Sequence, residues 1–360
     1  MHPRRDTRIF YRECVSLFKS GYDVYLLVAD GKGDELVEGV QVLDIGLESS
    51  RIKNFFKSGS KIRKKVEELK PSLVHFHDPE LMFVGKQLSS KFQIPVVFDI
   101  HENITVQILD KTYIPKFLRG LVSLVYKKVE QYYLKYFHLI IAEHSYQHVY
   151  TNKGRSLTTV LNMPDLRHFE PYINNNRAGN EIFYIGGISN ERGLDVTLEA
   201  LKILKSRGTD FFMHYIGPIS EEKIVELPIR EIKENVKFYG RMDSKEGFEV
   251  SKKCVVGLSV LKPIKNYVES YSTKIFEYMA IGLPVITSNF PLYQKVVERY
   301  DCGFCVEPYS SNELADSIEE LILNPDLVNQ MGENGQRAVN KKYSWASEEE
   351  KLLRRYKNLI

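Results

Sequence analysis

The chain has 360 residues, of which 43% are hydrophobic and 27% are charged; it contains four cysteines, and its formal net charge at pH 7 is +3. This composition excludes a disordered chain, provides apolar material for two domains of ordinary size, and gives no indication of nucleic acid as a partner. No run of about 18 apolar residues would span a membrane, and no apolar signal region follows the opening Met-His-Pro-Arg-Arg-Asp, so we expect a cytoplasmic protein.

Apolar runs of strand length alternate with helical patterns over the first half of the chain, which is typical of a parallel α/β sheet. The expected strands are Val24–Val28, Leu73–Phe76, Val96–Asp99, Leu139–Ala142 and Thr159–Leu161. The expected helices are Arg8–Ser20, Ile62–Leu69, Phe83–Phe92 and Ile114–Phe137. The stretch 168–180 is polar and rich in turn-forming residues, so we expect it to link two domains.

A second series of alternating elements follows this linker. Its expected strands are Ile182–Ile185, Phe211–Ile216, Val236–Tyr239, Val255–Ser259, Val285–Thr287 and Gly303–Val306. Its expected helices are Leu194–Lys205, Lys223–Leu227, Ser244–Ser251, Thr273–Ala280, Pro291–Glu298 and Ser311–Leu323. We therefore predict two Rossmann-like, doubly wound domains, residues 1–170 and 171–342, that face each other across a ligand-binding cleft. Residues 343–360 are predicted to form an amphipathic helix that crosses back to the first domain.

One segment of the second half has the features of a phosphate site. Ser272 is a good N-cap for the helix Thr273–Ala280, which Gly282 and Pro284 bring to an end. The free N–H groups of Thr273 and Lys274 and the positive end of the helix dipole would bind a diphosphate, and Lys274 adds a full positive charge. Glu277 lies one turn into the helix, within reach of a ribose, and Glu269 precedes the helix on a loop, within reach of a sugar on the far phosphate.

The segment from Glu269 to Ile286 resembles the pattern of glycosyltransferase family 4, retaining enzymes of the GT-B fold: two glutamates eight positions apart, a helix end of small residues, and Gly-x-Pro-Val-Ile. Further similar stretches are Phe76-His-Asp-Pro-Glu-Leu, Phe98-Asp-Ile-His-Glu, Leu161-Asn-Met-Pro, Tyr184-Ile-Gly-Gly and Tyr343-Ser-Trp. The resemblance implies that Glu277 holds the donor ribose, that Glu269 contacts the donor sugar as a catalytic residue, and that His101 lines the reacting centre. Because a strand precedes the His-Pro segment in that family, it also implies that a first strand is missing from this sequence.

The sequence departs from the family pattern at the expected diphosphate site. Gly187 stands where many members carry an arginine, and Arg192 stands where they carry a lysine. A guanidinium pairs well with phosphate oxygens, so we expect Arg192 and Lys274 to provide the charge. The sequence has no D-x-D triplet after a strand, and we expect donor binding without a metal or other cofactor.

Polar residues at the ends of first-half strands are candidates for the acceptor side. These are His77, Asp78 and Glu102. His75 and His77 are expected on one face of their strand and Asp78 on the other, which is a poor geometry for a metal. Two basic stretches that also carry aromatic residues, 51–70 with Phe55 and Phe56, and 110–137 with Lys111 and Tyr113, suit either an anionic membrane surface or an ordinary amphipathic helix.

The sequence thus predicts a retaining glycosyltransferase of hexosyltransferase type, which moves a sugar from a nucleotide sugar to a saccharide or polyprenyl-diphosphate-linked saccharide in surface polysaccharide synthesis. It would be cytoplasmic and peripheral on the inner face of the plasma membrane. A non-hydrolysing sugar-nucleotide epimerase and a non-catalytic two-lobed binding protein for sugar nucleotides share the predicted architecture and remain open.

Overall fold

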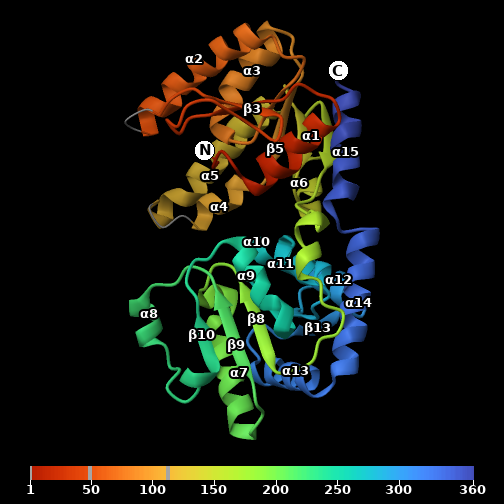
Figure 1. The fold of residues 1–360 in the computed structure, drawn as a ribbon. Coiled ribbons are helices and arrows are strands. Elements are labelled where there is room, and N and C mark those ends of the chain that lie inside the picture. The colour runs from red at the N-terminus through yellow and green to blue at the C-terminus, as the bar shows by residue number, and fades with distance from the viewer. Residues whose placement is uncertain (1, 48–50, 111–113) are drawn as a thin grey trace. The chain divides into compact units, whose positions relative to one another are not determined.

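The computed structural model describes residues 2–47, 51–110 and 114–360; for 51–58, 106, 110, 265 and 266 it describes the backbone alone (Figure 1). These residues form two compact units. Unit 1 comprises the chain up to Asn162 together with Ala346–Ile360, and unit 2 comprises Met163–Trp345. Among the described residues, the helices lack the combination of length and apolar character that crossing a membrane requires.

Unit 1 contains two sheets. Three strands have the order β1-β3-β2, and four parallel strands have the order β4-β5-β6-β7. The strands are β1 Tyr25–Val28, β2 Glu35–Val37, β3 Val40–Asp44, β4 Val74–Phe76, β5 Val96–Ile100, β6 His138–Ile141 and β7 Ser156–Thr159. The helices are α1 Val15–Lys19, α2 Arg51–Leu69, α3 Met82–Lys91, α4 Ile104–Asp110, α5 Lys116–Leu134, α6 Gln147–Tyr150 and α15 Trp345–Lys357. A π-helical segment, Thr7–Cys14, leads into α1.

Unit 2 is built on one parallel sheet of six strands in the order β10-β9-β8-β11-β12-β13. The strands are β8 Glu181–Ile185, β9 Phe212–Ile216, β10 Val236–Phe238, β11 Cys254–Ser259, β12 Val285–Ser288 and β13 Gly303–Val306. The helices are α7 Leu194–Arg207, α8 Glu221–Glu226, α9 Ser244–Val250, α10 Lys265–Glu269, α11 Thr273–Ala280, α12 Pro291–Val297, α13 Ser311–Leu323 and α14 Pro325–Lys341.

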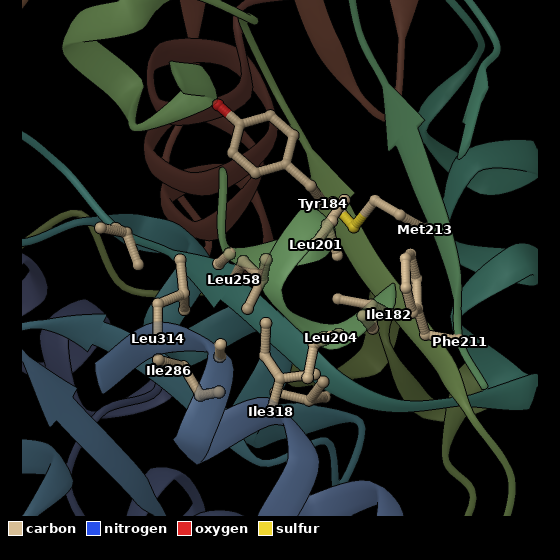
Figure 2. Packing of buried hydrophobic residues seen from close by; sticks show 14 of the residues in the cluster. Ile182, Tyr184, Leu201, Leu204, Phe211, Met213, Leu258, Ile286, Leu314 and Ile318 are labelled. Atoms are coloured by element: carbon tan, nitrogen blue, oxygen red, sulfur yellow. The ribbon is translucent and has the colours of Figure 1, made fainter. Parts of the chain in front are cut away.

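The core of unit 2 lies between its sheet and two of its helices. Leu258 of β11 packs in one cluster with Leu201 and Leu204 of α7 and Ile318 of α13 (Figure 2). Gly257 precedes Leu258 and therefore faces the other side of the sheet, where a Cβ would meet the ring of Tyr278 in α11. Helices α7 and α13 thus cover one face of the sheet, and α11 covers the opposite face.

A buried arginine holds the carboxyl end of α11. The guanidinium of Arg177, 1% exposed, donates hydrogen bonds of 2.6–2.8 Å to four backbone carbonyls, those of Ser251, Cys254, Ile281 and Gly282. Burial lowers the pKa of Arg177 to about 10, so it stays charged at neutral pH. Its charge lies at the negative end of the helix dipole, where it stabilises α11.

Most of the expected elements are present, and the alternation typical of α/β sheets is confirmed. The helices Thr273–Ala280 and Ser311–Leu323 have the predicted bounds. The expected strand Thr159–Leu161 is wrong in position, since β7 ends at Thr159. The sequence patterns also missed β2, β3, α4 and α14.

Candidate functional site

The turn after β8 brings the expected donor-binding residues of unit 2 together. Gly186 has φ +134°, and a Cβ there would lie 2.6 Å from Cε of Lys274, so only glycine fits. At Gly187 a Cβ would touch Nε and Cζ of Arg192 at 3.7 and 3.8 Å. The guanidinium of Arg192 therefore occupies the space into which a side chain at position 187 would extend.

Two cations thus converge on one glycine turn. Arg192 ends a short 3-10 turn, Asn190–Arg192, and Gly193 with φ +76° is the N-cap of α7. Lys274 lies in the first turn of α11 and is only 7% exposed. Burial, reinforced by the charge of Arg192 and opposed by Glu277, lowers the pKa of Lys274 to about 8. Two positive groups held close together, one of them desolvated, provide a strong site for an anion.

Aromatic rings position both cations. Nζ of Lys274 lies 5.0 Å from the ring centroid of Tyr184, and Cζ of Arg192 lies 5.8 Å from that of Tyr267. The Tyr184 hydroxyl, which Figure 2 shows directed away from the core cluster, donates a 2.5 Å hydrogen bond to the carbonyl of Gly187. The rings attract the cations through their faces and limit where the two side chains can move.

The N-cap side chain of α11 leaves the first amide groups of the helix without a capping hydrogen bond within the described chain. Ser272 occupies the N-cap position with extended backbone, as predicted, but within the described chain its side chain makes no capping hydrogen bond. Its Oγ lies 2.8 Å from Oγ of Ser259 at the end of β11 instead. Since Ser272 does not cap, the amide groups of Thr273 and Lys274 stay available to an anion.

The two glutamates differ in their surroundings. Glu277 lies in α11 and favours the charged form of Lys274, as expected for a neighbouring carboxylate. Glu269 is half-buried and is the last residue of α10, so the prediction that it lies on a loop was wrong. The buried Tyr293 hydroxyl lies 3.0 Å from the carbonyl of Tyr267 and 3.1 Å from that of Ser270, and it therefore fixes the backbone on both sides of Glu269.

In unit 1 the expected acceptor-side histidines also lie together. The rings of His75 and His77 are stacked, with centroids 4.6 Å apart, which confirms that they share one face of their strand. Nδ1 of His77 lies 2.9 Å from Nε2 of His101, so one of the two nitrogens donates to the other. Oδ1 of Asp78 lies 3.6 Å from Nε2 of His2, and Glu102 is exposed at the next position after His101.

A buried charged cluster lies beneath these histidines. Asp99 of β5 is fully buried and accepts hydrogen bonds from Nε and Nη2 of Arg8 at 3.2 and 2.9 Å. Nε of Arg8 also lies 2.9 Å from Oε1 of Glu13, which is 2% exposed. Asp99 lies 3.5–4.0 Å from the rings of His75, His77 and His101.

The cluster shifts the pKa of every group in it. Burial opposes the charge of Asp99, but Arg8 and the histidines outweigh burial and hold its pKa well below the usual range. Burial and the nearby Asp99 raise the pKa of Glu13 well above its usual range. Burial lowers the pKa of His75 to about 4 and also lowers those of His77 and His101, so the rings are neutral near pH 7.

The sequence patterns pointed to the histidines but missed Arg8, Glu13 and Asp99. A signal was present, since Asp99 ends an apolar strand pattern and Glu13 lies within the expected helix Arg8–Ser20. Charged residues are rarely buried unless they are paired, so the positions of Asp99 and Glu13 predict an oppositely charged partner.

Two family models match the chain. "Glycosyltransferase Family 4" matches residues 7–148, and "Glycosyl transferases group 1" matches residues 169–338. The chain belongs to glycosyltransferase family 4. The resemblance drawn from the segment Glu269–Ile286 is thereby confirmed.

Named members of the family are distant from this chain. It is 26% identical over 180 residues to an alpha-D-kanosaminyltransferase of Streptomyces kanamyceticus, with 49% of this chain and 45% of that protein covered. It is 23% identical over 176 residues to the capsular polysaccharide biosynthesis glycosyltransferase CapM of Staphylococcus aureus, with 45% and 42% covered. The chain therefore spans about half the length of the curated relatives it matches.

Solved structures show the fold. Alr3699/HepE of Anabaena, in complex with UDP and glucose, superposes with a TM-score of 0.67 over 93% of this chain and 99% of that one, at 15% identity. The prediction of a GT-B fold built on two parallel, Rossmann-like sheets is confirmed.

Proposed function

We propose that the chain transfers a sugar from a nucleotide sugar to a saccharide or lipid-linked saccharide, with retention of configuration, in the synthesis of a surface polysaccharide. The observation that carries this proposal is the convergence of Arg192 and Lys274 on the Gly186–Gly187 turn, beside the amino end of α11. Such a site matches the diphosphate of a nucleotide sugar in charge and in hydrogen-bond donors.

The proposed chemistry at this site is stabilisation of the leaving diphosphate. Negative charge grows on the diphosphate as the bond to the sugar breaks, and Arg192, Lys274 and the amides of α11 meet that charge without a metal. Glu277 holds the ribose and Glu269 contacts the sugar. The acceptor hydroxyl binds in unit 1 near His101, with His77, Asp78 and Glu102 around it.

UDP is the first donor nucleotide to test, since the Anabaena neighbour was crystallised with it. A thermal-shift screen of UDP-, GDP- and ADP-sugars identifies the donor, and product analysis with and without acceptor then separates transfer from epimerisation. We expect Glu269→Gln to bind the donor and lose transfer. Full transfer by that variant would contradict the role of Glu269, and turnover without an acceptor would contradict the transferase.

We further propose that the enzyme binds an anionic membrane surface through α5. Eight large apolar side chains of this helix are 37–83% exposed: Phe117, Leu118, Leu121, Val122, Leu124, Val125, Val129 and Tyr132. The side chains that α5 buries include Ser123 and Glu130, which bond to Thr105 and Tyr150. Of its large apolar side chains, α5 buries Leu134 but leaves these eight exposed, which is more than an ordinary surface helix exposes.

Positive charge accompanies this apolar face. Lys116, Lys127, Lys128 and Lys135 are exposed on the same helix, which suits the phosphates of anionic lipids. The expected contributions of Lys111 and Tyr113, and those of Phe55 and Phe56, lie outside the described residues or side chains. A lipid-linked acceptor would be reached from such a surface.

Flotation with liposomes of an anionic phospholipid tests the membrane proposal. The variant Leu121→Asp/Leu124→Asp should stay unbound, whereas Val225→Asp, at an 85% exposed valine of unit 2, should float like the unmodified chain. Binding should weaken as salt rises, because the lysine contribution is screened. Equal flotation of the two variants would contradict a role for α5.

A further inference from the structure

Unit 1 contains a set of ligand-type atoms of which the proposed transfer uses only those of His77, beside the acceptor. Glu13, His75, His77 and Asp99 each offer one nitrogen or oxygen atom, and these four atoms lie within 4.8 Å of one another. The residues come from three elements, the π-helical segment, β4 with the residue that follows it, and β5. The poor metal geometry expected from the sequence concerned Asp78 with the two histidines, whereas in the fold Glu13 and Asp99 lie beside them.

The two carboxylates of the cluster are buried together and share one cation. Glu13 and Asp99 are at most 2% exposed; Nε of Arg8 lies 2.9 Å from Oε1 of Glu13, and Nη2 of Arg8 lies 2.9 Å from Oδ2 of Asp99. Buried carboxylates in proteins are paired or coordinate a metal, and here one guanidinium serves two of them.

Several buried atoms of this cluster lack a hydrogen-bond partner within the described chain. They are Oε2 of Glu13, Oδ1 of Asp99, Nε2 of His75 and the donor Nη1 of Arg8, whereas Oε1 of Glu13 lies 2.9 Å from Nε of Arg8. Such atoms are rare in folded proteins, where buried polar groups are nearly always satisfied. Here three ligand-type atoms without a partner belong to one cluster.

The remaining atoms of the same side chains are held from outside. Nδ1 of His75 lies 2.8 Å from the Tyr356 hydroxyl, and Nδ1 of His77 lies 2.9 Å from His101. Arg8 donates to Oδ2 of Asp99. Metal-binding histidines and carboxylates characteristically use one atom for the metal and bond through the other to a neighbour, which fixes their orientation.

We propose that Glu13, His75, His77 and Asp99 bind one divalent first-row cation, zinc before others, at a closed structural site in unit 1. Two imidazoles with two carboxylates suit zinc, whereas magnesium and calcium prefer oxygen ligands alone. In a tetrahedral zinc site the ligand atoms lie roughly 3.3–3.6 Å apart, so the four side chains close by about an ångström on binding. With four protein ligands no open position remains, and the ion ties the π-helical segment to the sheet.

This site is independent of the donor site. Its ligands belong to unit 1, and the cations expected to hold the diphosphate belong to unit 2. The ion also orients His101, because a metal on Nε2 of His77 makes Nδ1–H the donor to Nε2 of His101. Metal content and UDP binding are therefore separate measurements, and either can fail without the other.

The test is metal analysis by mass spectrometry of the full chain, purified without a histidine tag from zinc-supplemented medium. We expect about one equivalent of zinc per chain, and a loss of at least about tenfold in Glu13→Gln and His75→Phe. The exposed His148 provides the matched control, and His148→Asn should retain the metal. UDP binding, measured on the same samples, should survive in all of them.

A second measurement does not depend on the variants folding. After chelator treatment, the unmodified chain should bind Co²⁺ with the visible absorption of tetrahedral cobalt, and zinc should displace it. A chain that holds less than about a tenth of an equivalent of metal and gives no such absorption overturns the proposal. In that case a proton on Glu13 balances the cluster. Full metal content in Glu13→Gln would overturn it as well.

Discussion

Lys274→Met is the most informative single change, because the structure predicts opposite effects on stability and on binding. Methionine matches the length of lysine, fits a position that is 7% exposed, and removes the charge. In the free protein this charge is unfavourable, since it is desolvated and lies near Arg192. In the complex the same charge would contact the diphosphate.

The magnitudes follow from the pKa. A fall from 10.5 to about 8 means that the folded protein disfavours the charged form by about 3 kcal/mol. The penalty is fully present below pH 8 and disappears above pH 10.5, where Lys274 is neutral in folded and unfolded chains alike. At pH 7 the variant should therefore gain up to about 3 kcal/mol of stability in unit 2. A lost charge-assisted hydrogen bond should raise the dissociation constant for UDP about 10- to 100-fold.

The assay combines thermal melting without ligand and isothermal titration with UDP, both at pH 7. Lys202→Met on α7 is the control, because it removes the same charge from a lysine that pairs with the exposed Glu199. That control should leave melting and affinity nearly unchanged. A lower melting temperature for Lys274→Met than for the unmodified protein would refute the conclusion that burial makes the charge of Lys274 unfavourable. Equal affinity of Lys274→Met and the unmodified protein for UDP would refute the role of Lys274 at the diphosphate.

Three further outcomes are expected. UDP affinity should fall as pH rises above about 8, because the diphosphate then has to draw a proton onto Lys274, and titrations in buffers of different ionisation enthalpy should show that uptake. Arg177→Met should destabilise unit 2 by at least about 3 kcal/mol, seen in denaturant unfolding, since four carbonyls lose their donor; an unchanged midpoint would contradict this. Tyr293→Phe should lower kcat more than it changes UDP affinity, because its hydroxyl bonds directly to the backbone on both sides of Glu269 and is linked to Arg192 only through the ring of Tyr267; equal losses in both would point to general unfolding.

The helix of the donor segment could be predicted from the sequence because the residues that define its ends lie next to it in the chain. Ser272, Gly282 and Pro284 mark the ends of α11, and the structure gives the helix the predicted bounds. The convergence of Arg192 with Lys274 follows once the strand–turn–helix order is known. The roles of Glu269 and Glu277 remain predictions.

The elements that were missed depend on contacts distant in sequence. Helix α14 contains Gly332 and Gly335, which lower helix propensity, yet both let α14 approach the segment that ends α11: a Cβ at Gly332 would meet the carbonyl of Gly282, and Gly335 packs on Met279. In β2 and β3 the strands are short, and Glu38 and Gly39, with φ +51° and +81°, make the tight turn between them. The cluster around Asp99 brings together residues that are distant in sequence. Asp99 and its hydrogen-bond donor Arg8 are 91 positions apart, and no local pattern predicts such a pair.

Arg177 also constrains the order in which unit 2 can fold. Its four carbonyl partners follow it by 74 to 105 residues, so none of these bonds forms until β11 and the end of α11 are in place. A partly folded chain with only β8, β9 and their helices would have to leave the guanidinium in water. Burial of this side chain is therefore a late event, and hydrogen exchange should show the backbone around it opening together with the whole sheet and not by itself.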